Sequence, residues 1–233
     1  MPPIQLLRKR KFLRSTNLDD LEAEVMELFE LRSLEENPPF AAAAKRGNHG
    51  KEISALQRAW VACVRKEARQ MPPEKNYSAK GLRKLAGALS RHLQTPNDFA
   101  NLPELFAEVG VRLVYVEMLP GGKIDGCAMF VDGYPVIGLS GRGKRLDKVL
   151  FALLHEIAHI LLEHVDAERI IAEDRFPTIP ARINGPWVDQ TADELGVARI
   201  VVIGQLQHRR HLDWRTTLAK NAPNVSDALD TWN

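Results

Sequence analysis

Two histidines and a glutamate lie close together in the run His155-Glu156-Ile157-Ala158-His159. On an α-helix, residues at i and i+4 lie one turn apart on the same face, so the imidazoles of His155 and His159 can reach one metal ion. Glu156 lies about 100° further round the helix, where its carboxylate can reach a water bound to that metal. Zinc lowers the pKa of such a water, and the carboxylate takes its proton as the water attacks a carbonyl carbon. The spacing therefore predicts a zinc site with His155 and His159 as ligands and Glu156 as the general base.

The residues around this motif are apolar on nearly every side, which predicts a buried helix over about residues 146–164. Burying a carboxylate without a partner costs free energy, so polar groups inside such a helix indicate a function. The alternative interpretation is two histidines that are satisfied within the core and a glutamate on the helix surface.

A catalytic zinc ion needs a third protein ligand and one open coordination position. The extended motif, in which a glycine and a third histidine follow the second histidine, is absent because Leu162 and Val165 occupy those positions. His164 lies five residues after His159, which turns it away from the ligand face of a continuing helix. We therefore expect His164 to interact with the negative C-terminal end of the helix instead.

The better candidates for the third ligand lie in the acidic segment 189–194. This segment follows a stretch interrupted by proline and glycine, and it opens a helix predicted from about Val188. Asp189, Asp193 and Glu194 each carry a carboxylate that can bind zinc. The alternative role for any two of them is to stabilise the positive N-terminal end of that helix.

Hydrophobic periodicity predicts the elements that must position these residues. Helices are expected over residues 17–32, 52–70, 79–94 and 103–109. Alternation predicts a strand from residue 111, and two further β-prone runs, Cys127–Val131 and Pro135–Leu139, are joined through Asp132-Gly133, a dipeptide typical of hairpins. This order predicts an α+β fold, in which a helical N-terminal region precedes a zincin-like domain with a small antiparallel sheet beside the metal-binding helix.

The charge is spread unevenly and supports a division into two regions. Residues 1–95 hold 18 Lys+Arg against 11 Asp+Glu, whereas residues 96–233 hold 14 against 19. With Thr95-Pro96-Asn97 as a break, we expect a basic helical region over 1–95 and a second domain over 96–233. A basic surface can face nucleic acid or an acidic protein. No nucleic-acid-binding motif accompanies the charge, so we expect a solvated surface and no direct nucleic-acid binding.

Several features of the sequence indicate the cellular compartment in which the protein is expected. No apolar run approaches the ~20 residues that a membrane-spanning helix requires, and no apolar signal core follows the basic residues 8–11. The two cysteines, Cys63 and Cys127, do not form a disulfide framework, so we expect a reduced cytoplasmic protein. Cys127 has no histidine near it in the sequence, and we expect it to pack rather than to act as a nucleophile.

Three segments together resemble the ImmA/IrrE family of zinc metallopeptidases. They are IDGCAMFVDGYPVIGLS (124–140), GRGKRLDKVLFALLHEIAHILLEH (141–164) and VDQTADELGVARIVV (188–202). The family shows a short hairpin, a charged turn, an HExxH helix and a later acidic helix that supplies the third ligand. The resemblance implies that His155, His159 and Asp189 bind Zn²⁺ and that Glu156 is the general base. The family usually has glutamate where this chain has Asp189, which reaches one methylene less far.

The resemblance also implies a function. Family members cleave or control helix-turn-helix repressors, including those of toxin-antitoxin operons, and many carry an N-terminal helix-turn-helix of their own. It therefore implies a zinc endopeptidase whose substrate is a regulatory protein, such as a DNA-binding repressor or an antitoxin partner. Residues 1–95 resemble the helical linker of longer members, so we expect no DNA-binding part here. The alternative is a non-catalytic zinc-binding regulatory or antitoxin module, which has no need of Glu156.

In zincins generally, an edge strand beside the active helix pairs with the substrate backbone. The runs 127–131 and 135–139 are the candidates for this strand.

Overall fold

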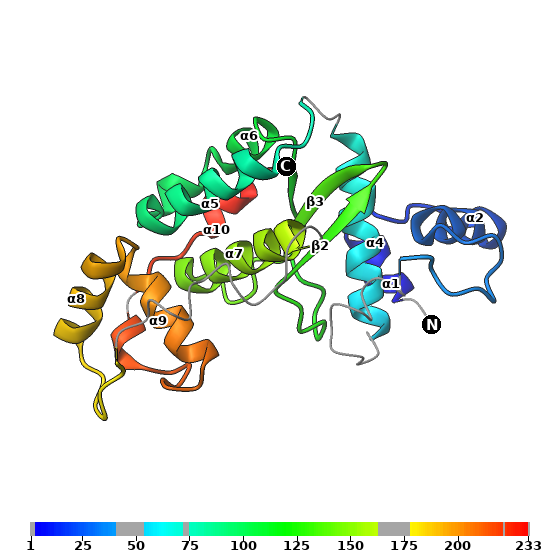
Figure 1. Ribbon diagram of the computed structural model, residues 1–233. Helices are drawn as coiled ribbons and strands as arrows, with labels where there is room; N and C mark the ends of the chain where they lie inside the picture. The colour runs from blue at the N-terminus through cyan, green and yellow to red at the C-terminus, as the bar shows by residue number, and fades with distance from the viewer. Residues whose placement is uncertain (1–2, 41–53, 72–74, 163–177, 221, 233) are drawn as a thin grey trace.

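A computed structural model of the chain describes residues 3–40, 54–71, 75–162, 178–220 and 222–232 (Figure 1). Its helices are α1 (Ile4–Lys9), α2 (Leu18–Phe29), α4 (Ala55–Gln70), α5 (Ala79–His92), α6 (Leu102–Ala107), α7 (Leu146–Leu162), α8 (Gly185–Leu195), α9 (Arg199–His208) and α10 (Ser226–Asp230). Its strands are β1 (Arg112–Tyr115), β2 (Gly126–Val131) and β3 (Tyr134–Leu139). The predicted α+β class is confirmed. Within these ranges, no helix is long and apolar enough to cross a membrane.

The sheet is mixed, so the prediction of an antiparallel sheet was wrong. β3 lies in the centre, parallel to β1 and antiparallel to β2. The hairpin turn at Asp132 and Gly133, whose φ angles of 52° and 82° suit a two-residue loop, accounts for the antiparallel pair, and the return of β3 alongside β1 adds the parallel one. This turn reverses the chain after β2 and returns β3 between β2 and β1. As a result β2 is an outer strand, and it packs against α7.

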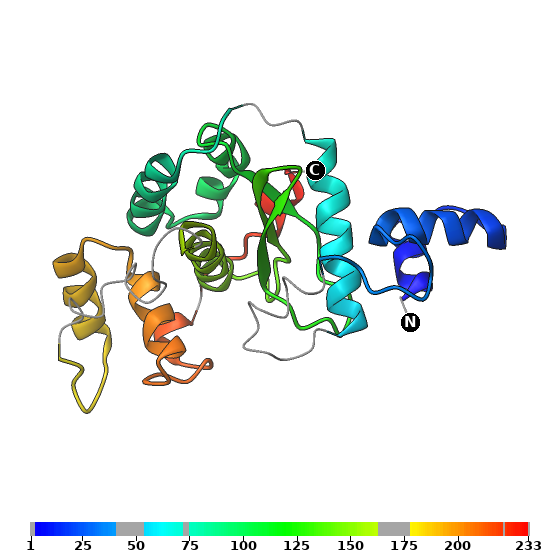
Figure 2. The same cartoon turned by 45° about the vertical axis from the view of Figure 1, so that its right-hand side comes forward.

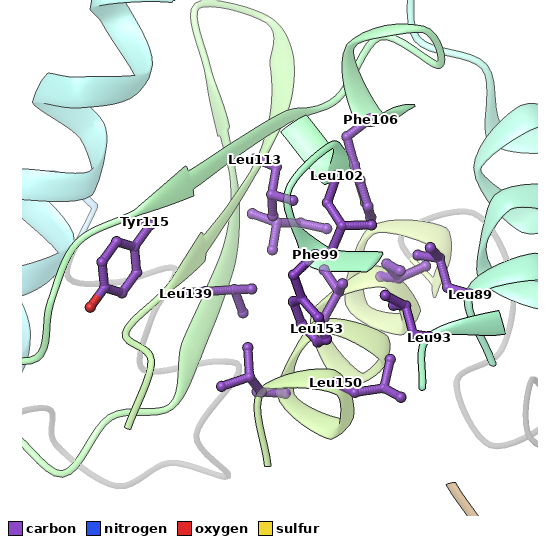
Figure 3. Close-up of a cluster of buried hydrophobic side chains, with 14 of the residues drawn as sticks. Leu89, Leu93, Phe99, Leu102, Phe106, Leu113, Tyr115, Leu139, Leu150 and Leu153 are labelled. Carbon is purple, nitrogen blue, oxygen red and sulfur yellow. The ribbon is translucent and has the colours of Figure 1, made fainter. Parts of the chain in front are cut away.

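Helices cover both faces of the sheet, as Figure 2 shows, with α4 on one side and α7 on the other. Successive strand residues point to opposite faces. Leu113 and Ile137 therefore join the core under α7, whereas Val114 and Val136 join the core under α4. Figure 3 shows the first of these cores, in which side chains of α5, α6 and α7 meet β1 and β3.

Two helices of the region 1–95 pack on elements of the region 96–233. The indole Nε1–H of Trp60 on α4 donates to the Val116 carbonyl at 2.7 Å. Leu89 on α5 is buried in the same core as α7. The boundary near residue 95 stays a prediction, and these contacts join the two regions.

Local signals explain where the helices begin and end. The Asn17 side chain accepts from the Asp19 N–H at 3.1 Å and caps α2, as its residue type predicts. Helix α8 begins at Gly185, before the predicted start at about Val188. The reason is that Pro186 in the first turn needs no N–H partner, so a proline that we interpreted as a break opens the helix instead.

Candidate metal centre

Helix α7 carries the histidine pair, and polar contacts fix its start. The Arg145 guanidinium pairs with Asp147 at 2.6 and 2.9 Å and also donates to the Ala219 carbonyl at 2.7 Å. Asp147 lies in the first turn, where a carboxylate is stabilised by the positive end of the helix. The Leu146 N–H donates to the Pro223 carbonyl at 2.8 Å. These contacts attach the start of α7 to the C-terminal part of the chain.

Most of α7 is buried in the core between the sheet and α5. Its buried apolar residues are Leu146, Val149, Leu150, Ala152, Leu153, Ile157, Ile160 and Leu161. Phe151, His155 and His159 follow one another at intervals of four residues and line a less buried side of the helix. Within the described residues, the histidines therefore project from the less buried side of an otherwise apolar helix.

The two predicted histidine ligands come together. Their Nε2 atoms are 3.1 Å apart, and the rings meet edge to face with centroids 4.6 Å apart. Zinc binds imidazole nitrogen at about 2.0–2.1 Å in tetrahedral geometry, which places two ligand nitrogens about 3.3 Å apart. The pair therefore fits two corners of one zinc site with little adjustment.

A phenylalanine supports the first histidine. The Phe151 and His155 rings are stacked at 17° with centroids 6.4 Å apart. A β-carbon at Gly204 on α9 would lie 3.1 Å from the Phe151 ring, so the α9 backbone packs closely on that ring. Neither residue was singled out from the sequence. The available signal was the position of Phe151, one helical turn before His155.

Glu156 lies under strand β2. Its side chain is buried, with an exposed fraction of 7%. A β-carbon at Gly126 would lie 2.9 Å from Glu156 Cγ and 3.0 Å from Oε1. The strand backbone can approach the carboxylate this closely because residue 126 has no side chain. Gly126 was also missed from the sequence, although a glycine within a strand often marks such an approach.

The surroundings of Glu156 disfavour its negative charge. Burial raises the pKa of Glu156 to about 8, and the nearby Asp125 carboxylate contributes to the increase. Asp125 is itself held by Arg142, whose Nη1 lies 3.1 and 3.2 Å from its two oxygens. A cation at the two histidines acts in the opposite direction, because it favours the ionised carboxylate.

Strand β2 presents backbone groups beside Glu156. In an antiparallel pair, residues that exchange hydrogen bonds alternate with residues that do not. The Ser140 N–H donates to the Asp125 carbonyl at 3.0 Å, which fixes the alternation along β2. The N–H and C=O groups of Gly126 and Ala128 therefore point away from β3. Of the two runs expected to pair with a substrate, β3 is paired on both sides, whereas β2 is paired on one side within the described residues.

The acidic candidates for the third ligand lie on α8. Asp189 is exposed and its Oδ1 pairs with Arg199 Nε at 2.5 Å. Glu194 accepts from Gln190 at 2.7 Å, and Asp193 is exposed. Across the part of the chain that the structure describes, no three His, Cys, Asp or Glu residues form a metal-binding group. The third ligand therefore stays a prediction, and His164 lies outside the described residues.

Cys127 lies on β2 next to Gly126, but its side chain points to the α4 face. Burial raises the pKa of its thiol well above the ordinary value, and the Glu156 carboxylate adds to the effect. A thiol of this kind is a poor nucleophile, which agrees with the packing role expected from the sequence.

Comparisons of the chain with protein-family models, with curated proteins and with solved structures gave no match. The resemblance to the ImmA/IrrE family therefore stays a prediction that rests on the sequence motifs.

Proposed function

We propose that the protein is a zinc-dependent metallopeptidase that hydrolyses a peptide bond of a protein substrate. The observation that supports this best is that the Nε2 atoms of His155 and His159 lie 3.1 Å apart on the helix that also carries the buried Glu156. Two imidazoles that converge on one point supply two of the ligands, and Glu156 on the same helix supplies the general base, that metal-assisted hydrolysis requires.

Each of these residues has a separate task. His155 and His159 would hold the metal, which when bound would lower the pKa of water and polarise a carbonyl oxygen. Glu156 accepts the proton of the attacking water while the new C–O bond forms. It then delivers that proton to the amide nitrogen as the C–N bond breaks, so that a carboxylic acid and an amine are released. Burial keeps bulk water away from Glu156, which strengthens its electrostatic interactions with the reacting groups.

The outer edge of β2 provides the surface on which an extended peptide can lie. The outward N–H and C=O groups of Gly126 and Ala128 can pair with a substrate backbone. Since Gly126 lies against Glu156, such a peptide passes the general base. This arrangement favours a peptide over a small amide as the substrate.

Asp189 is our proposed third ligand, as the resemblance implies. Its exposed ion pair with Arg199 does not oppose this role, because exposed ion pairs contribute little free energy and zinc can compete for the carboxylate. The proposed substrate class, a DNA-binding repressor or antitoxin partner in the cytoplasm, also rests on the resemblance. The two free cysteines suit a reducing compartment.

One observation favours a second candidate function, a zinc-binding regulatory module without catalysis. Burial raises the pKa of Glu156 to about 8, which disfavours the ionised carboxylate that a general base needs. A regulatory site needs the histidines but has no use for an ionised Glu156.

The Glu156→Gln variant decides between the two functions. The amide keeps the size of the side chain but cannot accept the proton, so we expect cleavage to fall by about 10²–10⁴-fold with unchanged zinc content. The zinc-loaded protein and the variant are incubated with a proteome-derived peptide library and, separately, with a co-expressed helix-turn-helix repressor. New termini are identified by mass spectrometry. Cleavage that persists in the variant would overturn the mechanism, and zinc binding without cleavage by either protein would favour the regulatory module.

A further inference from the structure

We propose that Phe130 on β2 selects the substrate by contacting a large apolar side chain about four residues from the cleaved bond. The inference rests on the proposed peptidase function. It assigns a specificity-determining residue that lies outside the metal-binding motif.

Phe130 lies on the same face of β2 as the general base. Side chains alternate along a strand, and residue 126 faces Glu156 on α7. Ala128 faces the same way and packs against the core under α7. Phe130 follows on this face, and 37% of its surface remains exposed, which is unusual for a large hydrophobic residue of this protein. The small residues at 126 and 128 therefore let β2 pack closely on α7, and a phenyl ring follows them on the same face.

The spacing fixes the distance between this ring and the reacting bond. Each residue of a strand rises about 3.3 Å, so Phe130 lies roughly 13 Å along β2 from Gly126. A peptide that pairs with Gly126 and Ala128 and continues in extended form passes Phe130 four residue steps from Gly126. An apolar side chain at that step can pack on the exposed phenyl ring without a backbone hydrogen bond at Phe130.

The backbone at Phe130 is already occupied, which leaves the ring as the feature that a peptide can use. Arg65 Nη1 donates to the Phe130 carbonyl at 3.4 Å. Arg65 is held in place by Glu30, which accepts its Nε–H and Nη2–H at 2.6 and 2.9 Å. Across the hairpin, Pro135 pairs with Phe130 at a position of the ladder that needs no N–H.

Within the described residues, the open edge of β2 is therefore short, comprising Gly126 and Ala128 before Arg65 contacts the Phe130 carbonyl. A short edge of this kind disfavours strand-to-strand pairing with a second copy of the chain, because natural edges are protected against it by charged side chains. It leaves room for a substrate segment that reaches the Glu156 carboxylate. The ring next to this segment then decides which peptides bind well.

Cleavage-site profiling tests the proposal. The zinc-loaded wild type, Phe130→Ser and Phe130→Glu are each given the same proteome-derived peptide library. We expect the wild type to prefer Phe, Leu or Met at one position about four residues from the cut, and Phe130→Ser to lose roughly ten-fold in kcat/KM for those peptides. Phe130→Glu is expected to shift the preference to Lys or Arg at the same position. Leu105→Ser on α6, where the leucine is 44% exposed, is the matched control and leaves the profile unchanged.

A binding arm separates this proposal from the proposed function. Zinc-loaded Glu156→Gln, alone and combined with Phe130→Ser, is applied to an array of the same peptides. Binding of apolar peptides that Phe130→Ser weakens, without cleavage by the wild type, would keep the subsite and overturn the peptidase. An apolar preference that is absent from the wild type, or that Phe130→Ser leaves intact, would overturn the role of Phe130. The absence of both cleavage and peptide binding would overturn both proposals.

Discussion

The Glu156 side chain packs directly against the backbone of Gly126, since a β-carbon at residue 126 would lie 3.0 Å from Glu156 Oε1. The contact joins the helix that carries the metal ligands to the outer strand of the sheet. It buries the proposed general base, and it holds that base beside the backbone groups that can pair with a peptide. Because residue 126 has no side chain, the proposed general base lies next to the strand edge that can bind a peptide.

A methyl group at Gly126 should disturb the proposed general base without removing the metal. Gly126→Ala forces β2 or the Glu156 side chain to move, and overpacking of this kind costs about 1–3 kcal/mol in the free energy of unfolding. We expect kcat/KM to fall by about 100-fold, because small misplacements of a reacting group are expensive. Zinc content should stay unchanged. The measurements are peptide cleavage, metal analysis and thermal unfolding.

Gly87→Ala on α5 is the control for this substitution, since a β-carbon there meets no atom within 4 Å. The helix gains up to about 1 kcal/mol from this change. A Gly126→Ala variant that cleaves as fast as the control would show that the contact with Glu156 has no part in the reaction.

Metal analysis of four alanine variants should identify the ligands. We expect His155→Ala to lose zinc and Asp189→Ala to bind it more weakly, whereas Asp193→Ala and Glu194→Ala keep it. Zinc at 100 times its Kd should add about 2.7 kcal/mol to the free energy of unfolding of the wild type and nothing to that of His155→Ala. Loss of zinc from Glu194→Ala with retention in Asp189→Ala would move the third ligand to Glu194.

The sequence predicted those features that depend on local patterns. The apolar periodicity around His155 located α7, and Asn17 and Ser78 marked the starts of α2 and α5, where their side chains cap the first turn. The Asp132-Gly133 turn was found because its backbone conformation requires those residue types.

Features that depend on contacts between distant segments could not be predicted in this way. The mixed sheet follows from the insertion of β3 between β1 and β2, and no pattern within β3 shows which strand will lie on its other side. The burial of Glu156 under Gly126 joins residues thirty positions apart. A proline such as Pro186 can either end one segment or lie in the first turn of the next helix, and the sequence alone does not distinguish the two. In the structure the Asn184 side chain caps α8, so Pro186 lies in its first turn.

A larger side chain at Gly204 should disturb the metal site from a distance. The α9 backbone packs on Phe151, and Phe151 stacks on His155. Gly204→Val is expected to push the Phe151 ring and weaken zinc binding by about 10–100-fold, as changes to the supports of metal ligands do. Competition with a chelator measures the affinity. When Phe151 is replaced by alanine, adding Gly204→Val should cause no further loss of zinc affinity. An unchanged affinity in Gly204→Val alone would show that the stack does not orient His155.

Low pH should weaken the hydrogen bonds that join Glu24 on α2 to Arg14 and Ser15. The Ser15 hydroxyl donates to the Glu24 carboxylate at 2.7 Å, and the backbone N–H groups of Arg14 and Ser15 donate at 2.7 and 3.1 Å. These hydrogen bonds lower the pKa of Glu24 from 4.5 to about 2, the Ser15 hydroxyl contributing most. A lowered pKa in the folded state gives stabilisation that is complete above the unfolded value of about 4.5 and is lost as the pH falls towards 2.

The Glu24→Gln variant makes this contribution measurable. The difference in free energy of unfolding between the wild type and Glu24→Gln should be constant above pH 5 and should shrink steadily between pH 4.5 and 2. Urea denaturation at a series of pH values gives this difference directly. Ser15→Ala removes the largest of the three hydrogen-bond contributions, so it should reproduce part of the pH dependence. Glu22→Gln removes a negative charge two residues earlier in α2, so it separates the effect of the hydrogen bonds to Glu24 from that of the lost charge. A difference that does not change with pH would show that Ser15 and Arg14 do not hold the Glu24 carboxylate in solution.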